Sequence, residues 1–87
     1  MYILSQCKHI IVNTDYVSEI YSCKRIMHSE ISGRREEMGA ICYESKDDDV
    51  IIGRYHNEET SMKVLQDIMG ALCSGSVTRF DMPEDNA

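Results

Sequence analysis

The sequence lacks any long apolar run. Its 87 residues contain no apolar stretch that approaches the ~20 residues needed to cross a bilayer, and the opening MYILSQCK turns polar too early for a secretory signal. We therefore expect no membrane association and a cytoplasmic location. A chain of this length forms one domain with a modest core. We expect it to gain stability by pairing with itself as a homo-oligomer.

Positive charge is also scarce. Nine lysines and arginines stand against fifteen acidic residues, which gives a net charge of −6 at neutral pH. Binding to DNA or RNA phosphate needs a basic surface, so the composition argues against nucleic acid as a partner. It leaves open a local basic pocket for a small anion, and it leaves open an acidic surface that meets a basic partner.

Motifs for catalysis or metal binding are missing as well. The four cysteines, at positions 7, 23, 42 and 73, are too far apart for a CxxC redox pair or for paired zinc ligands. The chain has no glycine-rich phosphate loop and no nucleophile elbow. The acidic residues 47–49 are not followed by the spacing of a calcium-binding loop and fit a solvated turn. We expect no enzyme activity, no metal, no cofactor and free thiols.

What the sequence does contain is a change of hydrophobic period. Before Asn57, apolar residues alternate or form short β-branched runs, which predicts strands. Polar clusters at 33–37 and 46–49 predict the tips of hairpins. The strands are expected at residues 2–5, 9–12, 16–22, 25–32, 38–44 and 50–55.

After Asn57 the period becomes helical. Asn57 is a favoured N-cap, and the glutamates that follow it suit the positive end of a helix dipole. Gly75 suits a left-handed stop. The apolar stripe consists of Val64, Leu65, Ile68 and Leu72. We predict a helix over residues 58–73, a short strand at 77–82 and an acidic flexible tail at 84–87.

Together these elements predict the α+β class. The expected architecture is an antiparallel meander of about five strands, with one C-terminal helix packed on it and a short final strand. Residues 1–83 form this single domain.

Three blocks of sequence carry a resemblance to a known family. The first is MYILSQ followed by IIVN, the second is GRYHNEETSMKVLQDI, and the third is FDMPED. Together they resemble a group of short β-rich proteins of Gram-positive bacteria and of their phages and mobile elements. The resemblance implies a compact β-rich domain with one helix, but it brings no established activity and no catalytic residues. A phage protein without an enzyme motif suggests interference with host machinery, including host defence.

Two groups of basic residues are candidate ligand contacts. Arg54 and His56 precede the start of the predicted helix, where free N–H groups and the helix dipole attract anions. The two glutamates of the first turn would repel an anion, so ordinary capping is the competing interpretation. Arg34 and Arg35 lie at a predicted hairpin tip. They are either solvated or reach over a pocket, on the same or a neighbouring subunit, to hold a phosphate.

Tyrosine is over-represented among the aromatic residues. Five of the six aromatic side chains are tyrosines. On a sheet face, tyrosine stacks on a flat base or forms a protein interface, while cross-strand packing under the helix is the competing interpretation. Tyr43 and Tyr55 are the candidates for stacking.

The sequence therefore favours a non-enzymatic binding protein and leaves three hypotheses open. In the first, an oligomer sequesters a nucleotide-type immune signal, whose phosphate and base contact Arg34, Arg35, Arg54, His56, Tyr43 and Tyr55. In the second, residues 47–49 and the acidic tail bind and block a basic host protein, as an anti-CRISPR-like or other inhibitor. In the third, the chain is a structural or interaction domain.

Overall fold

The computed structural model describes residues 1–29 and 32–85. These residues contain six strands and one α-helix, which confirms the predicted α+β class with a C-terminal helix and a short final strand. In chain order the elements are β1 (Tyr2–Leu4), β2 (Ile11–Asn13), a 3₁₀ turn (Thr14–Tyr16), β3 (Ile20–His28), β4 (Arg35–Glu44), β5 (Asp49–Tyr55), α1 (Glu58–Ser74) and β6 (Arg79–Asp81).

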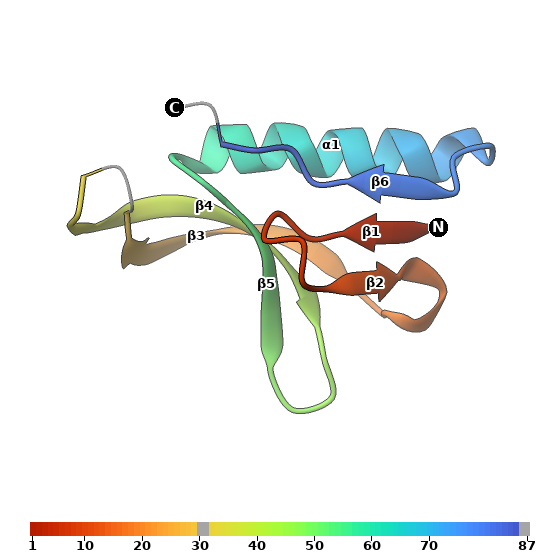
Figure 1. Ribbon diagram of the computed structural model, residues 1–87, viewed down its shortest axis with the longest axis horizontal. Coiled ribbons are helices and arrows are strands. Elements are labelled where there is room, and N and C mark those ends of the chain that lie inside the picture. Colours follow the sequence, from red (N-terminus) through yellow and green to blue (C-terminus); the bar gives the residue numbers. More distant parts are fainter. Residues whose placement is uncertain (30–31, 86–87) are drawn as a thin grey trace.

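The larger sheet is the antiparallel meander β3-β4-β5 (Figure 1). β3 is one strand of nine residues, whereas the sequence predicted two strands at 16–22 and 25–32. Cys23, at the expected break, pairs in register with Ala40, because the alternation of side chains continues across it. Residues 30–31 of the second expected strand lie outside the described part of the chain.

The smaller sheet has the order β2-β1-β6. β1 is antiparallel to β2 and parallel to β6, and its central residue Ile3 pairs with Val12 on one side and Phe80 on the other. The strands thus divide into two sheets, and the last strand returns to pair with the first. Residues 14–19, which include the beginning of the expected strand 16–22, form the 3₁₀ turn and a loop that leads into β3.

The helix begins where the sequence predicts and ends one residue later. The Oδ1 atom of Asn57 accepts a hydrogen bond of 2.8 Å from the backbone N–H of Thr60, which satisfies one of the free donors of the first turn. Gly75 ends the helix with a left-handed φ of 70°, a conformation that costs glycine little. Val64 and Ile68 are buried on the face that meets the sheets.

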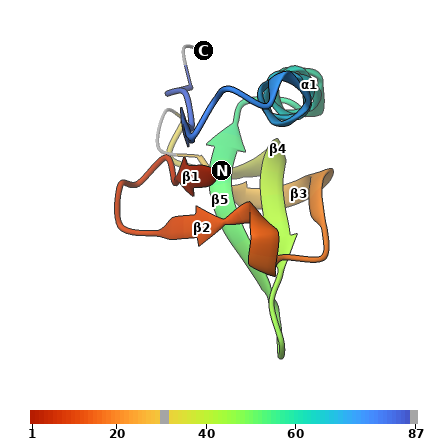
Figure 2. The same ribbon diagram turned by 90° about the vertical axis from the view of Figure 1, so that its right-hand side faces the viewer.

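A single hydrophobic core joins the two sheets and the helix. Figures 1 and 2 show α1 running along one side of the larger sheet, with β1 and β2 beside β5. Apolar side chains from both sheets and from the helix therefore meet in one cluster, and apolar burial is the main stabilising contribution. The buried members of this core are Ile3, Val12, Ile41, Ile52, Tyr55, Val64, Ile68 and Met82.

Gln6 links the two sheets through hydrogen bonds. Its side-chain Oε1 accepts from the backbone N–H of Arg54 at 2.9 Å, and its Nε2 donates to the carbonyl of the same residue at 2.9 Å. Nε2 also lies 3.2 Å from the carbonyl oxygen of Pro83. The backbone N–H of Gln6 donates to Ile52 at 2.8 Å. These bonds satisfy backbone groups along the outer edge of β5, which would otherwise be open to pairing.

Candidate functional site

A polar groove of about 610 Å³ lies where β5 leads into the helix. Both basic residues expected near the helix start, Arg54 and His56, line it. Three carboxylates line it too, those of Glu36, Glu84 and Asp85. The last two belong to the expected flexible tail, whose remaining residues 86 and 87 lie outside the described part of the chain.

His56 already has an anionic partner in this groove. Its Nδ1 lies 2.8 Å from Oδ1 of Asp85. The side chain of Arg54 is exposed, while its backbone is held by Gln6. A phosphate approaching His56 would have to displace Asp85 and come near two further carboxylates, which costs electrostatic free energy. The geometry therefore favours the capping interpretation of the helix start.

The other four expected ligand contacts line neither this groove nor the apolar groove described below. Arg34 and Arg35 are exposed, and Arg35 is the first residue of β4 rather than part of the turn. Tyr43 is half-buried and packs against the core. Tyr55 is fully buried, its hydroxyl donates to the carbonyl of Pro83 at 2.9 Å, and burial raises its pKa. Within one chain, the structure thus brings together two of the six residues.

The acidic tip between β4 and β5 is an internally bonded turn. Oδ1 of Asp48 accepts from the backbone N–H of Asp49 at 2.8 Å, and the carbonyl of Asp48 accepts from Ser45 at 2.9 Å. A carboxylate oxygen of Asp49 lies 3.7 Å from the guanidinium of Arg25. Within the described residues, no group of three or more histidine, cysteine or acidic side chains is placed to hold a metal ion.

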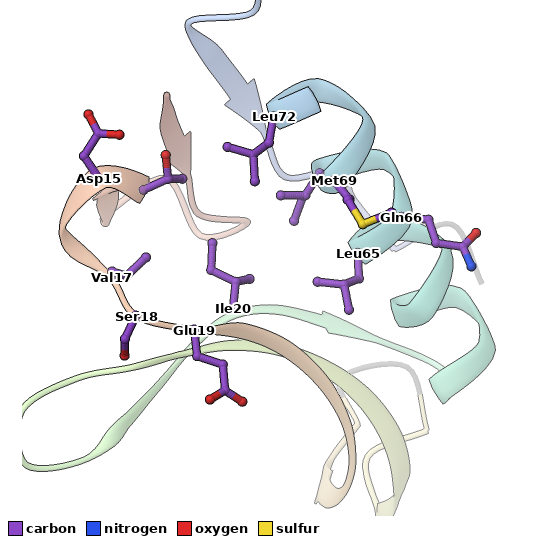
Figure 3. Close-up of a pocket in the computed structure, with 11 residues that line it drawn as sticks. Asp15, Val17, Ser18, Glu19, Ile20, Leu65, Gln66, Met69 and Leu72 are labelled. Carbon is purple, nitrogen blue, oxygen red and sulfur yellow. The ribbon is translucent and has the colours of Figure 1, made fainter. Parts of the chain in front are cut away.

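An apolar groove of about 500 Å³ lies between α1 and the segment that leads from the 3₁₀ turn into β3. Figure 3 shows Leu65 and Leu72 projecting from the helix toward the segment that carries Val17 and Ile20, and Met69 also lines the groove. Met69 is 63% exposed and Leu72 is 44% exposed. Large apolar side chains thus stand open to solvent on the helical wall.

Acidic side chains stand at the edge of the apolar groove. Asp15 and Glu19 line it and point outward from its centre (Figure 3), and none of its described lining residues is basic. Local hydrogen bonds hold the segment that carries Asp15 and Glu19 in place. The backbone N–H of Asp15 donates to Oδ1 of Asn13 at 3.1 Å, and the carbonyl of Glu19 accepts from the backbone N–H of Glu44 at 3.2 Å.

The apolar groove did not emerge from the sequence. Leu65 and Leu72 belong to the predicted stripe of the helix, and a stripe says nothing about how completely it is covered. The signal that was present is the turn chemistry of residues 13–15. A turn that continues to residue 19 shortens the expected strand 16–22. Part of the apolar stripe of the helix then has no strand to cover it.

The sequence matches no family model, and neither a curated protein nor a solved structure is significantly similar to it. The resemblance to short proteins of Gram-positive bacteria therefore stays a prediction. In the described chain, no helix has the length and apolarity required to cross a membrane.

Proposed function

We propose that this chain is a non-enzymatic binding protein whose apolar groove takes up an apolar, positively charged segment of a partner protein. The observation that carries the proposal is the convergence of apolar side chains from two separate elements on one groove, where Met69 and Leu72 on the helix are exposed and the opposite wall is half-buried. Such side chains lose contact with water when a partner docks, and this loss favours association. This proposal keeps the hypothesis of an acidic inhibitor, but it places the contact with the partner protein at the apolar groove instead of at residues 47–49.

The helical wall of the groove suits a helical ligand. Leu65, Met69 and Leu72 are spaced by four and then three residues, so they form a straight ridge along α1. Val17 and Ile20 stand opposite that ridge. An amphipathic helix that presents apolar residues at the same spacing fits between two such walls. Complete burial of a Met or Leu side chain contributes about 1.5–3 kcal/mol. Because Met69 and Leu72 are half-exposed, each can still contribute about half of that.

The charge of the groove selects a cationic partner. Asp15 and Glu19 stand at its edge, and the whole chain carries a net charge of −6. Lysine or arginine beside the apolar positions of the ligand would meet these carboxylates. Such complementarity raises the association rate and the specificity more than it raises the affinity. A second copy of this chain carries the same negative charge and is the less favoured occupant.

Occlusion is the mechanism that this binding mode supports. A segment held in the groove cannot contact its own target, so the chain blocks its partner by competition and needs no catalytic group.

A titration observed by NMR tests the proposal. The probe is a short cationic peptide with leucines at i, i+4 and i+7 and lysines on its other face, added to the ¹⁵N-labelled chain. We expect amide shifts confined mainly to residues 15–20 and 65–72. The control peptide keeps the leucines and replaces every lysine by glutamate, and it should bind more weakly, with the difference shrinking at high salt.

A pair of charge-matched variants locates the contact. Met69→Lys places a charge in the groove, whereas Met62→Lys makes the same change on α1 at a side chain that is 50% exposed and does not line the groove. We expect Met69→Lys to weaken binding at least about tenfold, or about 1.4 kcal/mol, and Met62→Lys to change it little. Equal losses in the two variants, or amide shifts elsewhere, would contradict the proposal.

Sequestration of a nucleotide-type signal remains a second hypothesis. The placement of Arg54 and His56 in one polar groove supports it, while the carboxylates of the same groove oppose it. A thermal-shift assay with a cyclic dinucleotide tests it, because a ligand that binds only the folded state raises the melting temperature. A shift that Arg54→Ala abolishes would support sequestration. If protein binding is the only function, no shift is expected.

A further inference from the structure

Two cysteines lie as neighbours on the face of the larger sheet that points away from α1. Ser22 identifies the opposite face, because its hydroxyl lies 2.7 Å from that of Ser61 on the helix. Side chains alternate along a strand, so Tyr21 and Cys23 project the other way. Cys42 on β4 is directly opposite Tyr21, and residues opposite each other share a face. Cys23 and Cys42 are therefore diagonal neighbours, one on each strand.

The two thiols differ in exposure. Cys23 is half-buried, so a small solute can reach it, whereas Cys42 is fully buried. Burial, followed by the neighbouring Cys23 thiol, raises the pKa of Cys42 to about 11. Cys42 thus keeps its proton at neutral pH and is shielded from direct attack. Only one member of the pair is open to a dissolved reagent.

An arginine is aimed at the accessible sulfur. Nε of Arg25 donates to Sγ of Cys23 at 3.1 Å. The same guanidinium lies 3.4 Å from the hydroxyl of Tyr21 and 3.7 Å from the carboxylate of Asp49, which hold it in position. A charged N–H donor at a sulfur stabilises the negative charge that the sulfur carries as a nucleophile.

We propose that Cys23 and Cys42 form a modification site for hydroperoxides, which oxidise the pair to an intramolecular disulfide. The sulfur of Cys23 attacks the outer peroxide oxygen and the O–O bond breaks. The departing oxygen takes up the proton that the Cys23 thiol releases and leaves as water or an alcohol, while Cys23 becomes a sulfenic acid. The sulfur of Cys42 then attacks the Cys23 sulfur. The hydroxyl of the sulfenic acid leaves with the thiol proton as a second water. Two thiols are oxidised and one peroxide is reduced.

The strand geometry favours a reversible bond. Diagonal neighbours are farther apart than directly opposite residues, so closing the bridge requires a small shift of one strand. The pairing of β4 with β5 is irregular at this point, with a register shift between Ile41 and Cys42, and a bulge accommodates such movement. A bridge formed in this way is accessible to reduction by a small dithiol.

Peptide mapping of the oxidised chain tests the inference. Cys7 and Cys73 are exposed, so both are first replaced by serine to remove competing thiols. The folded variant is treated with hydrogen peroxide, quenched with N-ethylmaleimide and analysed by mass spectrometry. We expect the loss of two hydrogens and a Cys23–Cys42 cross-linked peptide, both reversed by dithiothreitol. This readout leaves both reacting residues and the core unchanged.

Two further variants test the order of the steps. In Cys42→Ser the sulfenic acid has no partner, so dimedone should label residue 23. Arg25→Gln should slow oxidation roughly tenfold, equivalent to one lost charge-assisted contact in the transition state. Full retention of both free thiols in the folded serine-substituted chain would overturn the inference, as would dimedone labelling that is equal with and without Cys42. The site is independent of the proposed groove function.

Discussion

The backbone carbonyl of Asn57 lies directly over Gly39, and the space between them has room for a hydrogen atom but not for a methyl group. A Cβ at Gly39 would also lie 2.5 Å from Oγ of Ser61. The first turn of α1 therefore rests on the backbone of β4. This close approach determines how deeply the helix sits on the larger sheet, and with it the position of the helical wall of the apolar groove.

Gly39→Ala is expected to destabilise the chain. The added methyl group meets backbone atoms, which cannot move aside as a flexible side chain can, and overpacking of this kind costs about 1–3 kcal/mol or more. Gly70→Ala on α1 is the matched control, because a Cβ there meets nothing within 4 Å. Alanine favours the helix over glycine by about 0.5–1 kcal/mol, so the control should gain stability. Urea denaturation measures both, and a stable Gly39→Ala variant would contradict the close approach.

Gln6→Glu tests the link between the sheets. The substitution keeps the shape and one acceptor oxygen, but it removes the Nε2 donor that serves the carbonyls of Arg54 and Pro83. We expect a loss of about 1–3 kcal/mol in the free energy of unfolding. Gln66→Glu makes the same change of charge on the exposed side of α1 and should stay within about 0.5 kcal/mol. Equal effects in urea denaturation would show that charge, rather than the bridge, decides the result.

The buried Tyr55 should cause a loss of stability at alkaline pH. Burial raises its pKa in the folded chain above the ordinary value of 10.0. Above that value the unfolded chain releases the phenol proton more readily than the folded chain, so the unfolded state binds fewer protons and the free energy of unfolding falls as pH rises. The contribution is complete below about pH 10. The pKa of Tyr21, raised by its hydrogen bond with Asp49 and by burial, acts in the same direction.

Phenylalanine variants separate the effect of Tyr55 ionisation on stability from the effect of its hydrogen bond. Tyr55→Phe removes the ionisable group and should reduce the alkaline decline, while at pH 7 it loses the hydrogen bond to Pro83, worth about 1 kcal/mol. Tyr16→Phe is the control, since that side chain is 87% exposed and should leave both values nearly unchanged. Urea denaturation at several pH values from neutral to alkaline measures the two effects. An unchanged alkaline decline in Tyr55→Phe would mean that its ionisation does not limit stability.

Local signals in the sequence predicted the local structure well. The cap at Asn57, the stop at Gly75 and the apolar stripe between them act within a few residues, and the helix follows them. At the end of β5 the side chains alternate between solvent and core, since Arg54 is exposed and Tyr55 is buried. These features depend on backbone geometry and on the contrast between apolar and polar side chains, both of which are visible in the sequence.

Pairing between distant segments could not be predicted in this way. The parallel contact of β1 with β6 joins the two ends of the described chain, and no local pattern identifies a strand's partner. For the same reason the basic residues could not be grouped by proximity. Arg34 lies in the turn before β4 and Arg54 lies on β5, and only Arg54 lines the polar groove. The apolar groove depends on where a turn ends and on what the helix leaves uncovered, which are properties of packing.

The acidic residues at the edge of the apolar groove should control the rate at which a cationic peptide associates. Glu19→Lys reverses a charge at the groove edge and should lower the association rate of the cationic peptide by about three- to tenfold at low salt, with little effect on its dissociation. Asp47→Lys makes the same reversal at the exposed acidic tip between β4 and β5. Stopped-flow measurements at two salt concentrations distinguish them, because screening removes a charge effect. A larger loss for Asp47→Lys would move the contact surface to the acidic tip and away from the groove.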